Sequence, residues 1–249
     1  MHFVRFAPLV VLLVIGCGKP SPPPQHIQAW VESWGKMGMY LPSEDQIVFL
    51  RANLSDVTPE LAAAVAHENP DVRRRAAYAI GKIGPDAKSL GPALFLRLKT
   101  EQERLVRIYI INALAAVKFQ SKDANDLLRS RFDSLSSANV APQLFGGYAD
   151  VDEKINVAAA LYNLTSGDDR QEYLEFVTQW LKPPSSGSGP VENEGYWERR
   201  WMAVIALEGM QSASAAIPLL ESMLHEDGAK EWVAVHVPRV LGVLKRSGT

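Results

Sequence analysis

The sequence predicts an all-α protein built from repeated pairs of helices. Stretches with small and aliphatic residues on one helical face recur along the chain, and each follows a second amphipathic stretch. Proline, glycine and capping residues stand between these stretches, as they do at helix ends. Almost no segment shows the alternating apolar pattern of a β-strand.

Residues 26–57 are expected to form an N-terminal helical cap. Trp30 and Trp34 lie four residues apart in a predicted helix at 27–37, so they share one face. Ser43 and Gln46 have the spacing of a capping box before a further helix at 47–54. Such a cap shields the apolar end of a repeat array.

Five helices carry the repeat, and we expect the array to cover residues 58–246. The two clearest lie at 71–84 and 106–117, and weaker copies lie at 155–164, 199–210 and 233–244. Aligned on Ile80, Leu114, Leu161, Leu207 and Leu241, they are separated by 34, 47, 46 and 34 residues. A period of this length predicts a solenoid or array.

Each repeat helix has an amphipathic helix before it. These first helices are predicted at 59–67, 87–98, 124–132, 172–181 and 213–224. Thr58 and Pro59 have the order of a cap and a first-turn proline, and Gly84 is free to end the helix before it with a positive φ. Asp169 and Glu172 resemble a capping box.

The first copy resembles a HEAT repeat of the short bacterial type that is also seen in phycobilin lyase subunits. The resemblance is carried by Asp71-Val72-Arg73 followed by Ala76-Ala77, Ala79-Ile80-Gly81 and Ile83-Gly84. It implies a right-handed α-solenoid of about five HEAT-like helix pairs, whose second helices line a concave surface. A tetratricopeptide array shares the 34-residue spacing, but its tryptophan, leucine-glycine and tyrosine signature is absent.

The two long repeats contain insertions between their first and second helices, at 133–151 and 182–196. Insertions on one face of an array often mark its binding face. We therefore predict a partner-binding rim that uses Phe145, Tyr148, Tyr196 and Trp197. The alternative is that both insertions are tolerated loops, with the aromatic side chains folded back onto the helices.

A second candidate for partner binding is a row of arginines on the predicted concave surface. Arg73, Arg74 and Arg107 lie near the start of the second helices, with Arg199 and Arg200 further along. They suit an acidic segment of a partner. The alternative, which we favour, is that they pair with Asp71, Glu103 and Glu198 between repeats.

The N-terminus resembles a bacterial lipoprotein signal peptide. Arg5 precedes the apolar run 6–15, which ends in Val14-Ile15 and is followed by Gly16-Cys17. The run is too short to span a membrane. The resemblance implies removal of residues 1–16, attachment of lipid, palmitate included, at Cys17, and anchoring to a membrane. The alternative is an ordinary secretory signal with an incidental cysteine.

Residues 17–25 hold the predicted lipidated cysteine and a proline-rich tether, which is expected to be stiff and extended. Gly18 is not the aspartate that typically retains lipoproteins at an inner membrane. The periplasmic face of an outer membrane is therefore the favoured location in the bacterial cell envelope.

Composition and motifs exclude several kinds of function. Loss of residues 1–16 would change the formal net charge from −2 to −3, which disfavours nucleic acid as a partner. No cysteine other than Cys17 exists, so no thiolate nucleophile is expected in the domain. His67-Glu68 and His225-Glu226 invite comparison with deoxyhypusine hydroxylase, a HEAT-type enzyme, but they fall at the ends of first helices and not in second helices.

Nucleotide-binding loops, nucleophile elbows and zinc-binding helix motifs do not occur in the sequence. We therefore expect no cofactor, no metal and no catalytic residue. The leading hypothesis is a non-enzymatic, membrane-anchored scaffold or adaptor that binds another envelope protein. The alternative is an enzyme, or an enzyme subunit, with an unrecognised site on the same scaffold.

Overall fold

The computed structural model describes residues 27–36, 40–135, 150–183, 190–210, 212–226 and 231–247. Over these residues the regular structure is entirely helical, which confirms the predicted class, and no strand occurs. The α-helices are α1 Ile27–Ser33, α2 Glu44–Ala52, α3 Leu54–Ala66, α4 Pro70–Ile83, α5 Gly91–Leu98, α6 Arg104–Ala116, α7 Lys122–Ser134, α8 Asp150–Leu164, α9 Asp168–Thr178, α10 Pro190–Gly209, α11 Ile217–Met223 and α12 Glu231–Ser247. Short 3-10 helices lie at η1 Trp34–Lys36, η2 Gly84–Leu90, η3 Gln179–Leu181 and η4 Ser214–Ala216.

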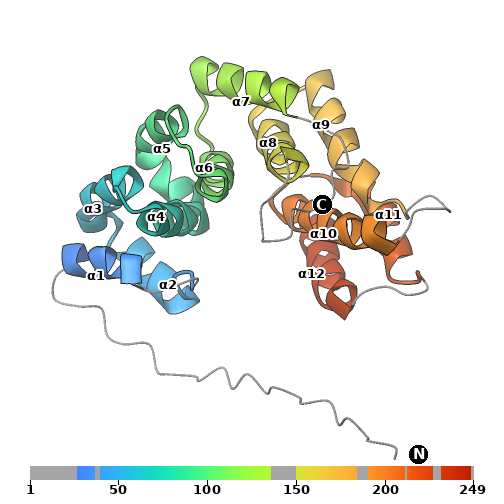
Figure 1. Ribbon diagram of the computed structural model, residues 1–249, viewed down its shortest axis with the longest axis horizontal. Helices are drawn as coiled ribbons and strands as arrows, with labels where there is room; N and C mark the ends of the chain where they lie inside the picture. The colour runs from blue at the N-terminus through green and yellow to red at the C-terminus, as the bar shows by residue number, and fades with distance from the viewer. Residues whose placement is uncertain are drawn as a thin grey trace, which may run out of the picture.

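The helices follow a curve with an outer and an inner row (Figure 1). Helices α3, α5, α7, α9 and α11 lie along the outer side, and α4, α6, α8, α10 and α12 lie along the inner side. Each outer helix packs against the inner helix that follows it in the chain, and each inner helix packs against the next inner helix. The five predicted first helices and five predicted second helices correspond to these two rows.

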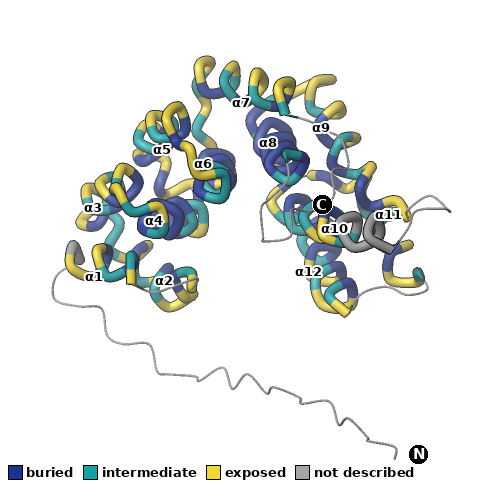
Figure 2. Tube along the Cα trace, viewed as in Figure 1, coloured by how far each residue is buried: buried dark blue, intermediate teal, exposed yellow. Residues whose placement is uncertain are grey.

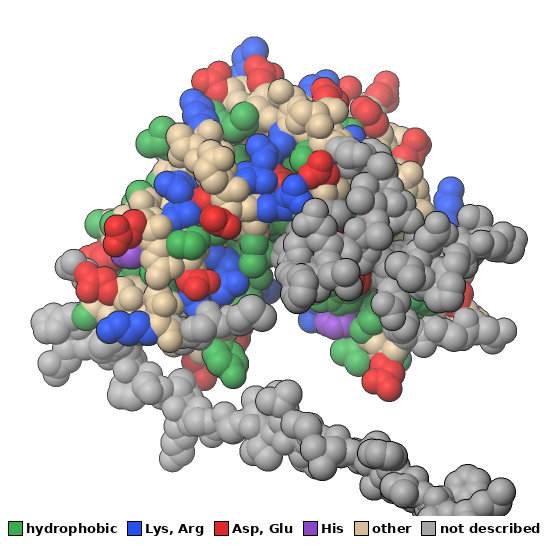
Figure 3. Space-filling view, in the orientation of Figure 1, with side chains coloured by type: hydrophobic (Ala, Val, Ile, Leu, Met, Phe, Trp, Pro, Cys, Tyr) green, Lys and Arg blue, Asp and Glu red, His purple; other side chains and the backbone are tan. Residues whose placement is uncertain are grey.

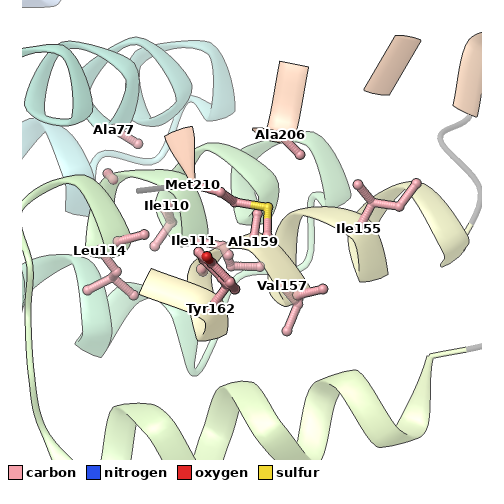
Figure 4. Close-up of a cluster of buried hydrophobic side chains, with 14 of the residues drawn as sticks. Ala77, Ile110, Ile111, Leu114, Ile155, Val157, Ala159, Tyr162, Ala206 and Met210 are labelled. Atoms are coloured by element: carbon pink, nitrogen blue, oxygen red, sulfur yellow. The ribbon is translucent and has the colours of Figure 1, made fainter. Parts of the chain in front are cut away.

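The inner helices supply much of the core, and the buried sides of the outer helices complete it. Figure 2 shows that they are buried along much of their length, whereas the outer helices expose one side. Apolar side chains from α4, α6, α8 and α10 meet there, among them Ala77, Ile111, Ile155 and Ala206 (Figure 4). Burial of these aliphatic side chains is the main term that stabilises the packing between successive pairs.

Small residues bring neighbouring inner helices close together. A Cβ atom on Gly81 of α4 would lie 3.4 Å from the Cα of Ala113 on α6, at the close end of ordinary van der Waals contact. Gly84 ends α4 with a φ of 77°, the left-handed backbone that was expected at this glycine.

The N-terminal helices pack against the first helix pair: α1 lies against α3, and α2 lies against α4. Trp34 is fully buried, and its ring lies 5.4 Å from that of Trp30 in an edge-on contact. The capping box at the start of α2 is confirmed, because the Ser43 side chain accepts from the Gln46 N–H and the Gln46 side chain accepts from the Ser43 N–H.

Three local predictions need correction. Pro59 lies inside α3 and not in its first turn, because the helix already begins at Leu54 and so spans the boundary predicted between residues 57 and 58. Asp169 does not cap α9: Gly167 is the N-cap, and the Asp169 carboxylate accepts from Arg129 instead. The second insertion is shorter than predicted, because α10 already begins at Pro190.

Replacement of a fully buried inner-row leucine, Leu161→Ala in α8, should lower the free energy of unfolding by about 2–5 kcal/mol, because it leaves a cavity in the core. Chemical denaturation followed by circular dichroism would measure the change. Leu96→Ala on α5 is the matched control: this side chain is 67% exposed, and its loss should cost less than about 0.5 kcal/mol. Equal effects of the two substitutions would contradict the assignment of the core to the inner row.

Candidate functional site

A basic residue recurs at one register position of the inner helices. Arg73, Arg107, Lys154 and Arg200 are separated by 34, 47 and 46 residues, the same separations as the aligned repeats. Each donates to carbonyl oxygens near the end of the outer helix of its own pair. The bonds are Arg73 Nη1 to His67 O (2.9 Å) and Glu68 O (2.6 Å), Arg107 Nη1 to Gln102 O (2.5 Å), Lys154 Nζ to Leu135 O (3.0 Å) and Arg200 Nη2 to Leu181 O (2.6 Å). Because helix ends leave carbonyl groups without helical partners, these bonds fix the turn within each pair.

A buried carboxylate joins the first two of these pairs. Glu101 follows α5 and its side chain is fully buried. It accepts two hydrogen bonds from the fork of Arg73, at 2.7 and 2.9 Å, and a third from Arg97 Nε at 2.8 Å. Burial by itself would raise the pKa of Glu101, but the bonds from Arg73 and Arg97 and from the Glu103 N–H outweigh it and lower the pKa to about 2.

The same arrangement returns one pair further along. Glu153 of α8 is fully buried and accepts from both sides of the Arg107 fork, at 2.9 Å each, and from Arg131 Nε at 2.5 Å. Burial opposes ionisation here too, but the hydrogen bonds from Arg107 and Arg131 lower the pKa of Glu153. Arg104 adds an ion pair with Asp150 at the start of α8.

The predicted arginine row is thus engaged within the protein. Arg74 pairs with Asp71 at 3.1 Å, but within α4 and not between repeats as the favoured alternative expected. Arg73 and Arg107 are also paired, but with Glu101 and Glu153 and not with the residues named from the sequence. Arg73 and Arg74 are 5% and 8% exposed, so little of either side chain is open to a partner.

A groove of about 460 Å³ crosses the inner row at the later turns of α4, α6, α8 and α10. Small residues form much of its lining. These are Ala77, Gly81, Ala113, Ala115, Ala116, Ala159, Ala160, Ala206 and Gly209. The absence of long side chains at these positions opens the groove between helices that otherwise pack closely.

Two tyrosines, three asparagines, Lys82 and Glu208 supply the polar chemistry of the groove. Tyr78 and Tyr109 meet edge-on with ring centres 6.0 Å apart, and burial, followed by the charge of Glu44, raises the pKa of Tyr78. Asn112 donates to Asn156 Oδ1 at 2.9 Å across the α6–α8 boundary. Amides and phenols bind other amides and hydroxyls, and Lys82 and Glu208 add one charge of each sign, so the groove suits a polar surface such as a polypeptide backbone.

The described residues contain no group of three or more His, Cys, Asp or Glu side chains placed to hold a metal ion. His67 accepts from the Asn69 N–H through Nδ1, and Glu226 binds Arg200. None of the described helices is both long and apolar enough to cross a membrane.

The aromatic residues predicted to form a binding rim are only partly within the described chain. Trp197 of α10 is half-buried, packs edge-on against Trp232 and lies under the guanidinium of Arg200 at 4.7 Å. Tyr196 belongs to α10, but its side chain is outside the described residues, as are Phe145, Tyr148 and Cys17.

Sequence reasoning missed Lys154, Glu101 and Glu153 as part of the site. A signal for Lys154 was present, because it stands at the register position of Arg73 and Arg107 in the aligned repeats. Glu101 and Glu153 occupy different places in their pairs, so no periodicity links them, and only the packing of adjacent pairs brings each to its arginines.

The substitution Glu101→Gln should remove stability that depends on pH. The carboxylate has a folded pKa of about 2 against an ordinary value of 4.5, so its contribution is complete above about pH 4.5 and is lost as the pH falls toward 2. The pH-dependent part of the difference in unfolding free energy between the two proteins should reach about 3 kcal/mol at most. Denaturation at pH 7, 4 and 3 would measure it, with exposed Glu172→Gln as the control. A difference that does not shrink in acid would contradict the lowered pKa.

No known protein family matches this chain, and neither does any characterised protein or any solved structure. The function is therefore inferred from the groove and from the residues around it.

Proposed function

We propose that this protein is a membrane-anchored scaffold or adaptor of the bacterial cell envelope, without enzymatic activity, which binds a partner protein in the groove of its inner helices. The single observation that carries the proposal is the groove itself. It crosses four successive inner helices and is lined by small residues, amides and phenols, with one lysine, Lys82, and one glutamate, Glu208.

The scaffold is inferred to be a right-handed α-solenoid of about five HEAT-like helix pairs behind an N-terminal cap. Support comes from the two rows of helices and from the basic residue that recurs at one register position in four of the inner helices. A recurring side chain with a recurring bond is what an array of similar units would display. Solenoids of this kind present long, continuous surfaces that suit protein partners.

The anchor is inferred to be lipid attached to Cys17, followed by the tether at 17–25, at the periplasmic face of an outer membrane. Stable anchoring needs more than one acyl chain. The signal-peptide resemblance implies a modification that supplies more than one. An envelope protein held near the same membrane would then be the natural partner.

The substitution Cys17→Ser should abolish labelling by radioactive palmitate in growing bacteria and should move the protein from the membrane fraction to the soluble fraction. The reason is that the thiol is the attachment point for lipid. Fractionation and autoradiography would measure both effects. Labelling that survives the substitution would rule out Cys17 as the lipidated residue.

A groove variant tests the binding function directly. Ala116→Arg places a long charged side chain in the groove, and crosslinking in intact cells followed by mass spectrometry should then capture the partner at about one tenth of the wild-type yield or less, since a misplaced charge in an interface costs several kcal/mol. Ala63→Arg on the exposed side of α3 is the matched control and should leave capture unchanged.

Both variants should retain the wild-type circular dichroism spectrum. A partner that is captured equally by the wild type and by Ala116→Arg would place the binding surface elsewhere. A protein that captures no partner in either form would contradict the adaptor function.

A further inference from the structure

Each buried carboxylate between the helix pairs is bound by more arginines than neutrality requires. Glu101 accepts from Arg73 and Arg97, and Glu153 accepts from Arg107 and Arg131. One arginine balances one carboxylate, so each cluster keeps a surplus positive charge. The two carboxylates are fully buried, whereas the side chains of Arg97 and Arg131 are 25% and 26% exposed, so the surplus charge faces the solvent.

The partly exposed arginine of each cluster, Arg97 or Arg131, binds its carboxylate without using its terminal nitrogens. Among the hydrogen bonds of the described residues, Arg97 of α5 and Arg131 of α7 donate through Nε alone. The terminal nitrogens Nη1 and Nη2 of both side chains therefore have no partner within the described chain. A guanidinium in this state can still bind a carboxylate through its outer edge.

The two arginines stand at equivalent places in successive pairs. They are separated by 34 residues, as are Arg73 and Arg107, which hold the same two carboxylates from the inner row. Arg104, at the start of α6, is 36% exposed, and its Nε lies 3.6 Å from Glu153. We name Arg97, Arg104 and Arg131 the arginine strip.

The strip is positive in a protein whose formal net charge is −2. Arg73 and Arg97 pair with one buried carboxylate, Glu101, and Arg107 and Arg131 pair with another, Glu153. Figure 3 shows Lys and Arg side chains on the face that it draws, with Asp and Glu side chains among them.

We propose that the arginine strip binds an acidic segment of a partner polypeptide, with carboxylates of that segment held by the outer edges of Arg97 and Arg131. The strip lies toward the first turns of the inner helices, as Arg104 begins α6, whereas the groove lies toward their last turns, where Gly209 ends α10. It is a second surface, and its occupation does not depend on the groove.

A linear acidic segment fits the strip better than an anionic membrane surface does. The cations recur once per helix pair, and packed helices lie about 8–10 Å apart, a spacing that side chains along an extended segment can follow. A flat anionic membrane would also meet carboxylates beside the strip, such as the 43% exposed Asp150 and the exposed Glu103. Those groups would be repelled by acidic lipids.

The test uses a fluorescent oligoglutamate peptide of about eight residues, roughly 26 Å long when extended, and the full chain that begins at residue 17 with Cys17→Ser. Fluorescence anisotropy at about 0.01 M ionic strength, where charges act over about 30 Å, should show saturable binding. An oligoglutamine peptide of equal length should not bind. Binding should weaken strongly at about 0.15 M salt, because screening then shortens the range of the charges.

The double variant Arg97→Gln, Arg131→Gln should raise the Kd for oligoglutamate about tenfold or more, since two charge-assisted contacts are lost. The matched control is the double variant Lys122→Gln, Arg129→Gln, which removes two charges from the exposed side of α7. It should change the Kd less than about threefold, because these cations lie off the strip and pair with Asp169 and Asp126.

If the glutamine double variant does not fold, Arg97→Lys, Arg131→Lys keeps the charges but removes the planar forks, and it should still weaken binding measurably. The proposal is overturned if oligoglutamate and oligoglutamine bind alike, or if the control variant weakens binding as much as the strip variant. It is also overturned if vesicles of phosphatidylglycerol bind while the peptide does not. The peptide assay does not involve the groove, so loss of capture in the Ala116→Arg variant and loss of peptide binding are separate outcomes.

Discussion

A carboxylate buried between two helix pairs is tolerated only if arginines reach it from both pairs. The isolated charge would cost several kcal/mol to desolvate, and removal of one partner from a buried ion pair typically costs about 3–5 kcal/mol. Glu101 and Glu153 meet this condition, because Arg73 and Arg107 come from the pair before each carboxylate and Arg97 and Arg131 come from its own pair. The same two arginines also hold the carbonyl groups of the turn in their own pair. The relative placement of successive pairs therefore depends on these few side chains.

The two candidate binding surfaces follow from that placement. With α4, α6 and α8 held in register, the small residues on their inner side leave a groove in place of a packed surface. The outer arginines, Arg97 and Arg131, complete the coordination of the buried carboxylates and still present unused donors to the solvent. Under the two proposals made above, the groove would bind polar groups of a partner and the arginine strip would bind acidic ones.

Local patterns predicted the helices well but their first residues less well. Ser43 and Gln46 form the expected capping box because both partners lie within one turn, and Gly84 takes its positive φ because no other residue does so without strain. Pro59 did not mark a helix start, because α3 already begins at Leu54. Within the helix the proline lacks an N–H group, so one backbone hydrogen bond is lost there. Asp169 failed as a cap because Arg129, forty residues away in the chain, binds its carboxylate.

The sequence by itself determined the helical class, the pairing of helices and the positions of the inner row, because these depend on periodicities within one helix and on capping residues at its ends. Only the tertiary structure decided which carboxylate meets which arginine: Arg73 pairs with Glu101 and Arg107 with Glu153, and neither carboxylate was named as a partner from the sequence. The physical reason is that an ion pair between helix pairs depends on how the pairs stack. The same stacking brings the Asn112 amide to Asn156 and opens the groove. Neither feature can be predicted from a pattern within one helix.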